Sequence, residues 1–407
     1  MSAVFKTNFI FQNKGWLKNH INNILNFYYP RCMDYINGGY FNCFFDDGKI
    51  CDFRSKSLVG TTRFIYDFSI GSILNINRET YLSAAEHGLK FLEDYFLDKE
   101  NGGYYWLLNE RQPITTTKFA YGHAFVLLAS SKAYEAGISW AINIMDYVFN
   151  ILEEHFWETK YRLYADEISS DWSKTSSYRG QNANMHLCEA MISSYEATSN
   201  IKYLKRAEEL AKSVTINLAS QSDGLIWENY YDNWKINWNY KEKVEDLKEF
   251  RADGFVPGHS IEWSKLLLML YKHLPQKWLI EKAEFLYNTS LKNALDKKYG
   301  GIFYTLTPDF HPLDKDKYYW VMAETIGASA FLAFYTKDDY YWNVYDYIFY
   351  YCWIFFIDKK HGGWYSKLNR ENQRYSNIKS SLSKTDYHPI TNCYETIKLL
   401  SHNKSLF

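Results

Sequence analysis

The chain has 407 residues and a net charge of −1, because 46 Lys and Arg face 47 Asp and Glu. This balance argues against a general nucleic-acid-binding protein, which would carry a basic excess. Hydrophobic residues make up 47% of the chain and aromatic residues 19%. The first value excludes a disordered chain, and the second suits both a large packed core and the walls of a sugar-binding site.

The N-terminus and the cysteines bear on the compartment. The N-terminal stretch, MSAVFKTNFIFQNKGW, lacks the apolar run of a secretory signal peptide. No CxxC pair occurs, so we expect free thiols, no zinc site and a cytoplasmic protein. The six cysteines are Cys32, Cys43, Cys51, Cys188, Cys352 and Cys393.

One stretch, residues 340–357, is about as apolar and as long as a membrane span. It is dominated by Tyr, and acidic and amide residues lie at its start. We therefore predict a buried helix there and no membrane partner.

Turn-like segments flanked by aromatic residues recur six times along the chain. They recur at nearly equal intervals, of which the fourth is the longest, and their marker positions are Gly38, Gly102, Arg162, Gly224, Gly300 and Gly362. Each segment predicts a short β-hairpin, because glycine permits positive φ and alternating aromatic residues follow. The third segment lacks glycine and is the weakest of the six.

Two kinds of helix are expected between these turns. Residues 80–98, 200–218 and 277–295 have apolar side chains at i, i+3 and i+4, which is typical of helices with one buried face. Residues 121–137, 184–200, 258–274 and 323–339 are apolar on several faces, as helices buried all round would be. We predict an all-α fold, a single-domain (α/α)6 barrel over residues 1–407 with short β-hairpins at one end. An open solenoid is the alternative.

Polar residues recur where the inner helices are expected to begin. One from each unit gives the series Arg63, Tyr121, His186, His259, Glu324 and His388, whose spacing follows that of the marker turns. If the inner helices run parallel, their N-terminal ends lie at the same end of the ring, and all six positions surround the mouth of one cavity. Four of the 11 histidines, His123, His186, His259 and His388, share this placement, so we interpret them as functional rather than structural.

These residue types suit proton transfer. Imidazole titrates near neutral pH, and a carboxylate three positions after a histidine, as in His259 and Glu262, can orient it or share a ligand. Arg63 could hold an anionic oxygen, or it could form an ion pair with Asp67. Trp320 could be a platform for a sugar or a core residue. The HExxH, P-loop, GxGxxG and GxSxG motifs are absent from the sequence, so we expect no metal and no cofactor.

The motifs RGQNANMHLCEA, PGHSIEW, DKDKYYWVMAETIGA and KTDYHP resemble the N-acylglucosamine 2-epimerase superfamily, from about Trp16 to Leu400. They are most similar to its branch of D-mannose and sulfoquinovose isomerases. The resemblance implies an (α/α)6 barrel acting on a monosaccharide. It implies His259 and His388 as the acid/base pair. To the other implied pocket residues we add Trp320, which makes the substrate-binding set Arg63, Tyr121, Asn182, His186, Glu262, Trp320 and Glu324.

The expected reaction is aldose–ketose isomerisation, most simply of D-mannose and D-fructose, through a cis-enediol and without a metal. His259 would shuttle the C2 proton, and His388 would open the ring or take the complementary acid/base role. Glu262 and Glu324 would orient the histidines or bind hydroxyls. The alternatives are sugar 2-epimerisation, sulfoquinovose isomerisation with Arg251 as an added cation, an inverting glycosidase using Glu262 and Glu324, and a non-catalytic sugar-binding protein. Residues 229–248 should shape the mouth of the pocket, and a homodimer is possible.

Overall fold

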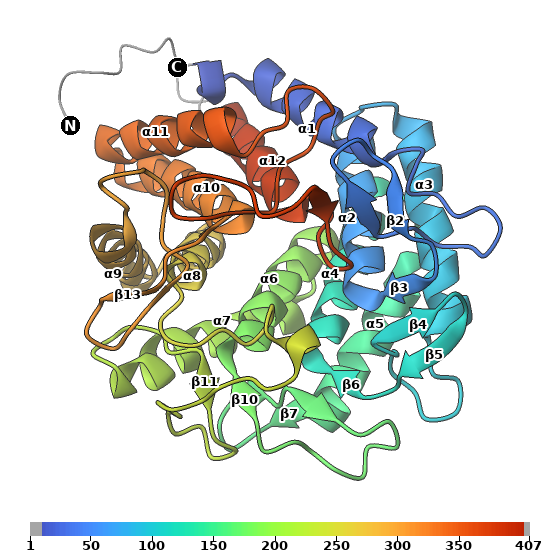
Figure 1. Ribbon diagram of the computed structural model, residues 1–407. Coiled ribbons are helices and arrows are strands. Elements are labelled where there is room, and N and C mark those ends of the chain that lie inside the picture. The colour runs from blue at the N-terminus through green and yellow to red at the C-terminus, as the bar shows by residue number, and fades with distance from the viewer. Residues whose placement is uncertain (1–9, 403–407) are drawn as a thin grey trace.

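The computed structural model describes residues 10–402, and its helices form two concentric rings (Figure 1). Each helix of the inner ring packs against the next, and α12 packs back against α2, so the ring is closed. The inner helices are α2 Leu58–Ile73, α4 Ala120–Ala136, α6 Gln181–Thr198, α8 Pro257–Tyr271, α10 Tyr319–Thr336 and α12 Tyr387–His402. The prediction of an (α/α)6 barrel is confirmed, and the open solenoid is wrong.

The outer ring covers the inner one. Each outer helix packs against the inner helix that precedes it in the chain, except that α1 at the N-terminal end packs against α12. The outer helices are α1 Lys14–Tyr28, α3 Arg78–Phe91, α5 Ala141–Ile151, α7 Ile201–Lys212, α9 Lys277–Ala294 and α11 Asp339–Phe355. Three of them continue into π-helical turns, at Leu92–Phe96, Leu152–Phe156 and Ser213–Leu218.

The burial of the two helix types follows their sequence patterns. Helix α7 buries one face, through Tyr203, Leu204, Ala207, Leu210 and Ala211. Helix α10 is buried almost all round, and its Gly327 touches α12 so closely that an added Cβ would lie 1.8 Å from Asn392 Oδ1. The apolar stretch 340–357 falls largely in α11, which packs against α10. Among the described residues no helix meets the length and hydropathy needed to cross a bilayer.

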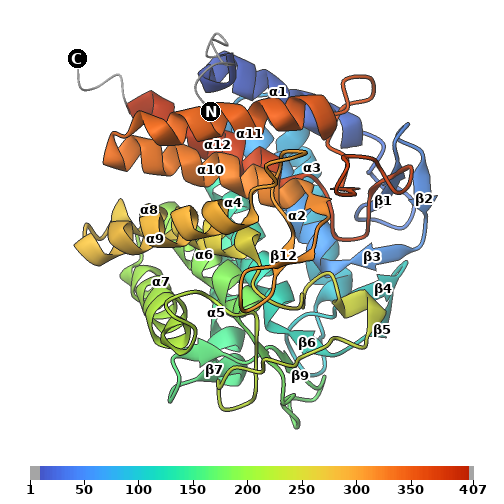
Figure 2. The same ribbon diagram turned by 60° about the vertical axis from the view of Figure 1, so that its left-hand side comes forward.

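Short antiparallel strands gather at the end of the barrel where the inner helices begin, and β1 to β5 are seen on the right in Figure 2. Strands β3, β6, β10 and β14 each lead into an inner helix and pair with a strand of the following unit, and β16 pairs with β1 across the chain ends. The strands are β1 Cys43–Phe45, β2 Ile50–Asp52, β3 Ser55–Ser57, β4 Leu107–Asn109, β5 Gln112–Thr115, β6 Lys118–Phe119, β7 Trp157–Glu158, β8 Leu163–Tyr164, β9 Glu167–Ile168, β10 Arg179–Gly180, β11 Asn229–Tyr230, β12 Thr305–Leu306, β13 Pro312–Asp314, β14 Lys317–Tyr318, β15 Lys367–Leu368 and β16 Ile378–Ser380.

The marker turns are tighter than the predicted hairpins. Gly38 and Gly39 have φ of 85° and 67°, and in the third turn Arg162 takes the same left-handed region with φ of 54°. Four of the six turns are closed by a single β-bridge, such as Leu97 with Tyr104. The third, β7–β8, has two paired residues on each strand. The left-handed position therefore survives even where glycine is missing.

A buried ion pair that the sequence analysis missed ties these turns to the inner helices. Lys118 on β6, directly before α4, lies 2.7 Å from Asp98 in the preceding turn, and both side chains are almost fully buried. Equivalent pairs, at a similar separation in the sequence, are Lys56–Asp34, Arg179–Glu158, Lys317–Asp296 and Lys379–Asp358. Burial opposes ionisation of Asp98, but Lys118 and backbone N–H groups outweigh it and lower its pKa to about 2.

One sequence expectation is wrong at this end of the barrel. Cys43 and Cys51 form a disulfide across the β1–β2 hairpin, with their Cα atoms 5.3 Å apart. The strand register brings the two residues together, which their spacing alone does not reveal. The other four cysteines are free thiols, as expected, and all four are buried.

Candidate active site

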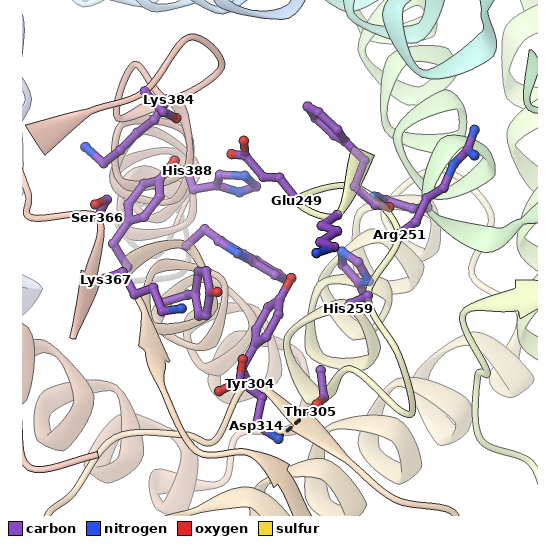
Figure 3. Close-up of a pocket in the computed structure, with 18 of the residues that line it drawn as sticks. Glu249, Arg251, His259, Tyr304, Thr305, Asp314, Ser366, Lys367, Lys384 and His388 are labelled. Atoms are coloured by element: carbon purple, nitrogen blue, oxygen red, sulfur yellow. Dashed lines mark hydrogen bonds between the residues drawn. The ribbon is translucent and has the colours of Figure 1, made fainter. Parts of the chain in front are cut away.

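The inner helices begin around one cavity of about 720 Å³ (Figure 3). Figure 3 shows His259 and His388 facing this cavity, with Glu249, Tyr304 and Lys384 around it. Most of the residues that the sequence analysis selected lie on its wall, and they come from all six inner helices. They are Arg63, Tyr121, Asn182, His186, His259, Glu262, Trp320 and His388.

The His259 ring is held by a carboxylate that the sequence did not single out. Its Nδ1 lies 2.9 Å from Glu228 Oε2, which also accepts a hydrogen bond of 2.9 Å from Gln181 Nε2. Trp263 Nε1 donates to Gln181 Oε1 at 2.7 Å and fixes that amide. A carboxylate at Nδ1 favours the tautomer that carries its proton there, which leaves Nε2 able to accept a proton.

The His388 ring has a matching arrangement. Its Nδ1 lies 2.7 Å from Glu324 Oε1, and Asn392 Nδ2 donates to the same oxygen at 2.8 Å. Lys265 Nζ donates to the other oxygen of Glu324. Burial opposes ionisation of Glu324, but Lys265 and His388 outweigh it and lower the pKa of this carboxyl to about 2. Burial lowers the pKa of His388 to about 4, so its ring is neutral at pH 7.

Both imidazoles pack against the same indole. The ring centroid of Trp320 lies 4.9 Å from that of His259 and 5.7 Å from that of His388. Among residues 10–402, neither imidazole Nε2 has a hydrogen-bond partner. Two proton-accepting atoms from different helices therefore serve one cavity.

A third imidazole lies beside this pair. His186 Nδ1 lies 3.0 Å from Glu189 Oε2, and Tyr387 donates to the other Glu189 oxygen at 2.6 Å. The centroid of the His186 ring is 6.3 Å from that of His388. Burial lowers the pKa of His186, so it too is a neutral ring.

Arg63 faces the cavity and forms no ion pair with Asp67, which instead accepts a hydrogen bond of 2.7 Å from Thr385. Its guanidinium donates to Ser383 O at 2.8 Å and to Tyr121 Oη at 3.1 Å, while its Nε has no partner. Of the two interpretations offered by the sequence, the structural ion pair is wrong. A buried guanidinium with an unused donor is suited to holding a substrate oxygen.

Two more groups on the wall have unused hydrogen-bonding atoms. Neither carboxyl oxygen of the buried Glu262 has a hydrogen-bond partner, and Asn182 Oδ1 has none either. Burial and the charge of Glu324 raise the pKa of Glu262 well above its usual value. Glu262 is therefore a neutral carboxylic acid, which can both donate to and accept from a sugar hydroxyl.

Two residues that the sequence analysis selected lie off the cavity wall. Glu324 lies one turn beyond Trp320 and behind the His388 ring, where it can orient that histidine but is not placed to bind substrate. His123 was expected to be functional, but it is fully buried, with Nδ1 2.7 Å from Phe119 O and Nε2 3.1 Å from Tyr104 N. Its position two residues after Tyr121 turns it about 200° around the helix, away from the cavity.

The segment of residues 241–253 covers part of the mouth. The ring of Phe250 meets those of Trp106 and Tyr121 edge-on, and Ser383 donates to Glu249 at 2.8 Å. The expectation that residues 229–248 shape the mouth agrees with this placement, although the cover extends to Asp253.

Two groups of side chains have the composition of a metal site: His186, Glu189 and Glu262, and Glu262, Glu324 and His388, with ligand atoms within 4.8 Å of one another. In the second group the Lys265 ammonium already binds Glu324. In the first group Tyr387 and His186 already occupy the oxygens of Glu189. Glu189 and Glu324 therefore already have partners within the protein, while Glu262, which belongs to both groups, has none, and we assign no metal ligands.

The residues that sequence reasoning missed are those behind the wall. Gln181, Lys265 and Asn392 lie within or beside the quoted motifs and could have been selected for their polarity on otherwise apolar inner helices. Glu228 follows the fourth marker turn, and no local pattern signals its contact with His259.

The fold and this cavity define an (α/α)6-barrel protein with a histidine–carboxylate site at the N-terminal ends of its inner helices. The family model described as N-acylglucosamine 2-epimerase (GlcNAc 2-epimerase) matches residues 39–392. The chain belongs to this family.

Relatives within the family include isomerases and epimerases. D-mannose isomerase of Marinomonas mediterranea is 44% identical over 392 residues, which cover 96% of this chain and 98% of that protein. A crystal structure of D-mannose isomerase matches with a TM-score of 0.91 at 44% identity, over 95% of this chain and 98% of its own. Cellobiose 2-epimerase of Dictyoglomus turgidum is 27% identical over 405 residues, which cover 95% and 98% of the two chains. The protein is therefore an enzyme of a family that isomerises sugars.

Proposed function

We propose that the protein is an aldose–ketose isomerase that interconverts D-mannose and D-fructose. The observation that carries this proposal is the pair of imidazoles, His259 and His388, which flank Trp320 in one cavity, each with Nδ1 at a carboxylate and Nε2 unoccupied. The 44% identity to a D-mannose isomerase over nearly the whole chain supports the choice of sugar.

The proposed reaction passes a proton from C2 to C1 of the open-chain sugar. His259 Nε2 takes the C2 proton, the C2–H electron pair forms the C1=C2 bond, and the electrons of the C1 carbonyl move onto O1 to give a cis-enediolate. The O2 proton then passes by way of His388 to O1, the O2–H electron pair forms the C2 carbonyl, and the C1=C2 pair takes back at C1 the proton carried by His259. A C2 proton is weakly acidic, so the site must stabilise the enediolate oxygens as well as supply the base.

The remaining residues are assigned to these oxygens. His388 exchanges protons with O5 during ring opening and with O1 and O2 during the transfer, and its neutral ring at pH 7 suits both directions. Arg63 and Asn182 hold the enediolate oxygens, and the neutral Glu262 binds a hydroxyl. Trp320 offers its face to the sugar ring.

The geometry disfavours two of the alternatives. Carboxyl oxygens of Glu262 and Glu324 lie within 4.8 Å of each other, whereas inverting glycosidases separate their carboxyl groups by about 6.5–9.5 Å. Arg251, the cation considered for a sulfonated sugar, is already paired with Glu167 at 2.6 Å and Glu242 at 3.1 Å. An inverting glycosidase and a sulfoquinovose isomerase are therefore weaker candidates.

Sugar 2-epimerisation remains the second candidate, because cellobiose 2-epimerases are among the relatives over nearly the full chain. It uses the same pocket but returns the proton to the opposite face of C2. Incubation with D-mannose in D₂O, followed by NMR, distinguishes the two reactions. Fructose as the product supports the isomerase, glucose with deuterium at C2 supports the epimerase, and binding with neither product nor exchange would mean a non-catalytic sugar-binding protein.

The roles of the two histidines are tested by His259→Asn and His388→Asn. Each should lose most of its turnover while still binding sugar in calorimetry, because the wall of the cavity is otherwise intact. His311→Asn is the matched control, since that side chain is 79% exposed and outside the cavity. Near-normal turnover in either cavity variant would show that its histidine has been given the wrong role.

A further inference from the structure

A buried lysine lies beneath the catalytic cavity, on the same helix as His259. Lys265 follows His259 and Glu262 at intervals of three positions along α8, is fully buried and is not part of the cavity wall. Its Nζ donates to Glu324 Oε2 and lies 3.3 Å from Asn392 Oδ1. It cannot touch a substrate from this position, so any effect it has on catalysis must pass through other residues.

Charged and titratable groups from every neighbouring inner helix surround this ammonium. Its charge interacts with Glu262 on its own helix, Glu189 on α6 and Glu324 on α10. These carboxyl groups in turn contact His388 and Tyr387 on α12 and His186 on α6, and Arg63 on α2 acts on Glu262 through its charge. Burial opposes its charge, but the carboxylates Glu324 and Glu189 outweigh that cost and raise the pKa of Lys265, so it stays charged at neutral pH.

A buried cation is not needed for packing. Replacing a buried ion pair by apolar residues of similar size is often neutral or favourable, so a retained buried charge calls for another role. The partner of this lysine suggests that role, because Glu324 binds Lys265 with one oxygen and His388 with the other. Within the described chain, Glu228 at His259 forms no ion pair with a lysine or arginine. The cation thus acts on one of the two imidazoles.

We propose that Lys265 is a positioning residue that neutralises Glu324 and thereby keeps His388 as a neutral ring in a fixed orientation. This inference rests on the proposed function, in which His388 accepts and returns protons. Without the ammonium, the uncompensated carboxylate would draw a proton onto the His388–Glu324 pair. His388 would then be imidazolium over part of the working pH range and unable to accept a proton.

The test compares Lys265→Met, which keeps the length and removes the charge, with Lys265→Arg, which keeps the charge. In the Met variant, kcat/KM for D-mannose at pH 5, relative to its value at pH 7, should be about tenfold lower than in the wild type. KM should change little, and the Arg variant should recover the wild-type profile. Lys118→Met is the matched control, because it removes a buried lysine from an ion pair outside the cavity and should leave the pH profile unchanged.

A second readout separates this inference from the proposed function. NMR titration of the His388 ring, assigned with His388→Asn, measures protonation without any turnover. The Met variant should bind this proton about 100-fold more tightly than the wild type, which is the change that a tenfold loss at pH 5 requires, whether or not D-mannose is the substrate. A folded Met variant in which His388 titrates as in the wild type, and in which the fall of kcat/KM towards acid pH is unchanged, would overturn the proposal.

If Lys265→Met does not fold, a double variant still tests the proposal. Lys265→Met combined with Glu324→Gln removes both charges and leaves an amide oxygen at His388 Nδ1. It should fold and should keep the low proton affinity of His388. A double variant that folds but has the raised proton affinity would contradict the charge argument, as would one that fails to fold while Glu324→Gln alone folds.

Discussion

The fully buried His123 should make the protein lose stability in mild acid. Its Nδ1–H donates to Phe119 O and its Nε2 accepts from Tyr104 N–H, so both nitrogens are used by the neutral ring and a second proton would break a bond. Burial lowers the pKa of His123 to about 3, against 6.5 for an unfolded chain. Between these two pKa values the unfolded chain binds a proton at His123 and the folded chain does not. The free energy of unfolding therefore falls as the pH drops below 6.5 towards 3.

The size of the effect follows from these two pKa values. Between pH 7 and pH 5 the linkage removes about 2 kcal/mol of unfolding free energy. For a chain of 407 residues, with an unfolding entropy of about 0.85 kcal/mol/K, this corresponds to about 2 °C in Tm. His123→Gln keeps an acceptor near Tyr104 N and has nothing to titrate, so its Tm should fall by about 2 °C less than that of the wild type over this interval.

The assay is differential scanning calorimetry of both proteins at pH 7 and pH 5 in the same salt. Comparing the two pH-induced differences cancels the general cost of the substitution and the titration of all other groups. Equal differences in wild type and variant would refute the reasoning, since His123 would then be protonated alike in the folded and unfolded chains.

Three further outcomes are expected. Lys118→Met should lower the free energy of unfolding by about 3 kcal/mol, because it leaves the buried Asp98 carboxylate without its cation. Thermal unfolding should show this loss, while activity at room temperature persists. Glu228→Gln should lower kcat about 10- to 100-fold with little change in KM, since His259 loses the charge that fixes its tautomer; an unchanged kcat would exclude this role. Gly327→Ala should lower the free energy of unfolding by about 1–3 kcal/mol, because the new Cβ would displace Asn392. It should also lower kcat, since Asn392 donates to the Glu324 oxygen that holds His388; calorimetry and steady-state assays measure the two effects.

The sequence was most informative about the sixfold helix repeat and about which helix ends surround the cavity. Marker turns at nearly regular intervals and two helix types predicted the (α/α)6 barrel, and the polar residues at the inner-helix starts predicted which helices meet at the site. These inferences succeed because periodicity and helix polarity are local properties that the ring repeats six times. The same logic placed His123 at the site wrongly, because a two-residue offset on a helix reverses the direction of a side chain.

What depended on the tertiary structure was the set of partners. The Cys43–Cys51 disulfide, the Glu228 carboxylate at His259 and the Lys265 ammonium at Glu324 each join residues whose spacing carries no pattern. The local sequence therefore determined which helix carries a histidine and at which position on that helix. Whether that imidazole is charged, which tautomer it adopts and which atom faces the cavity depend on desolvation and on charges a few ångströms away, and only the closed ring of helices brings those groups together.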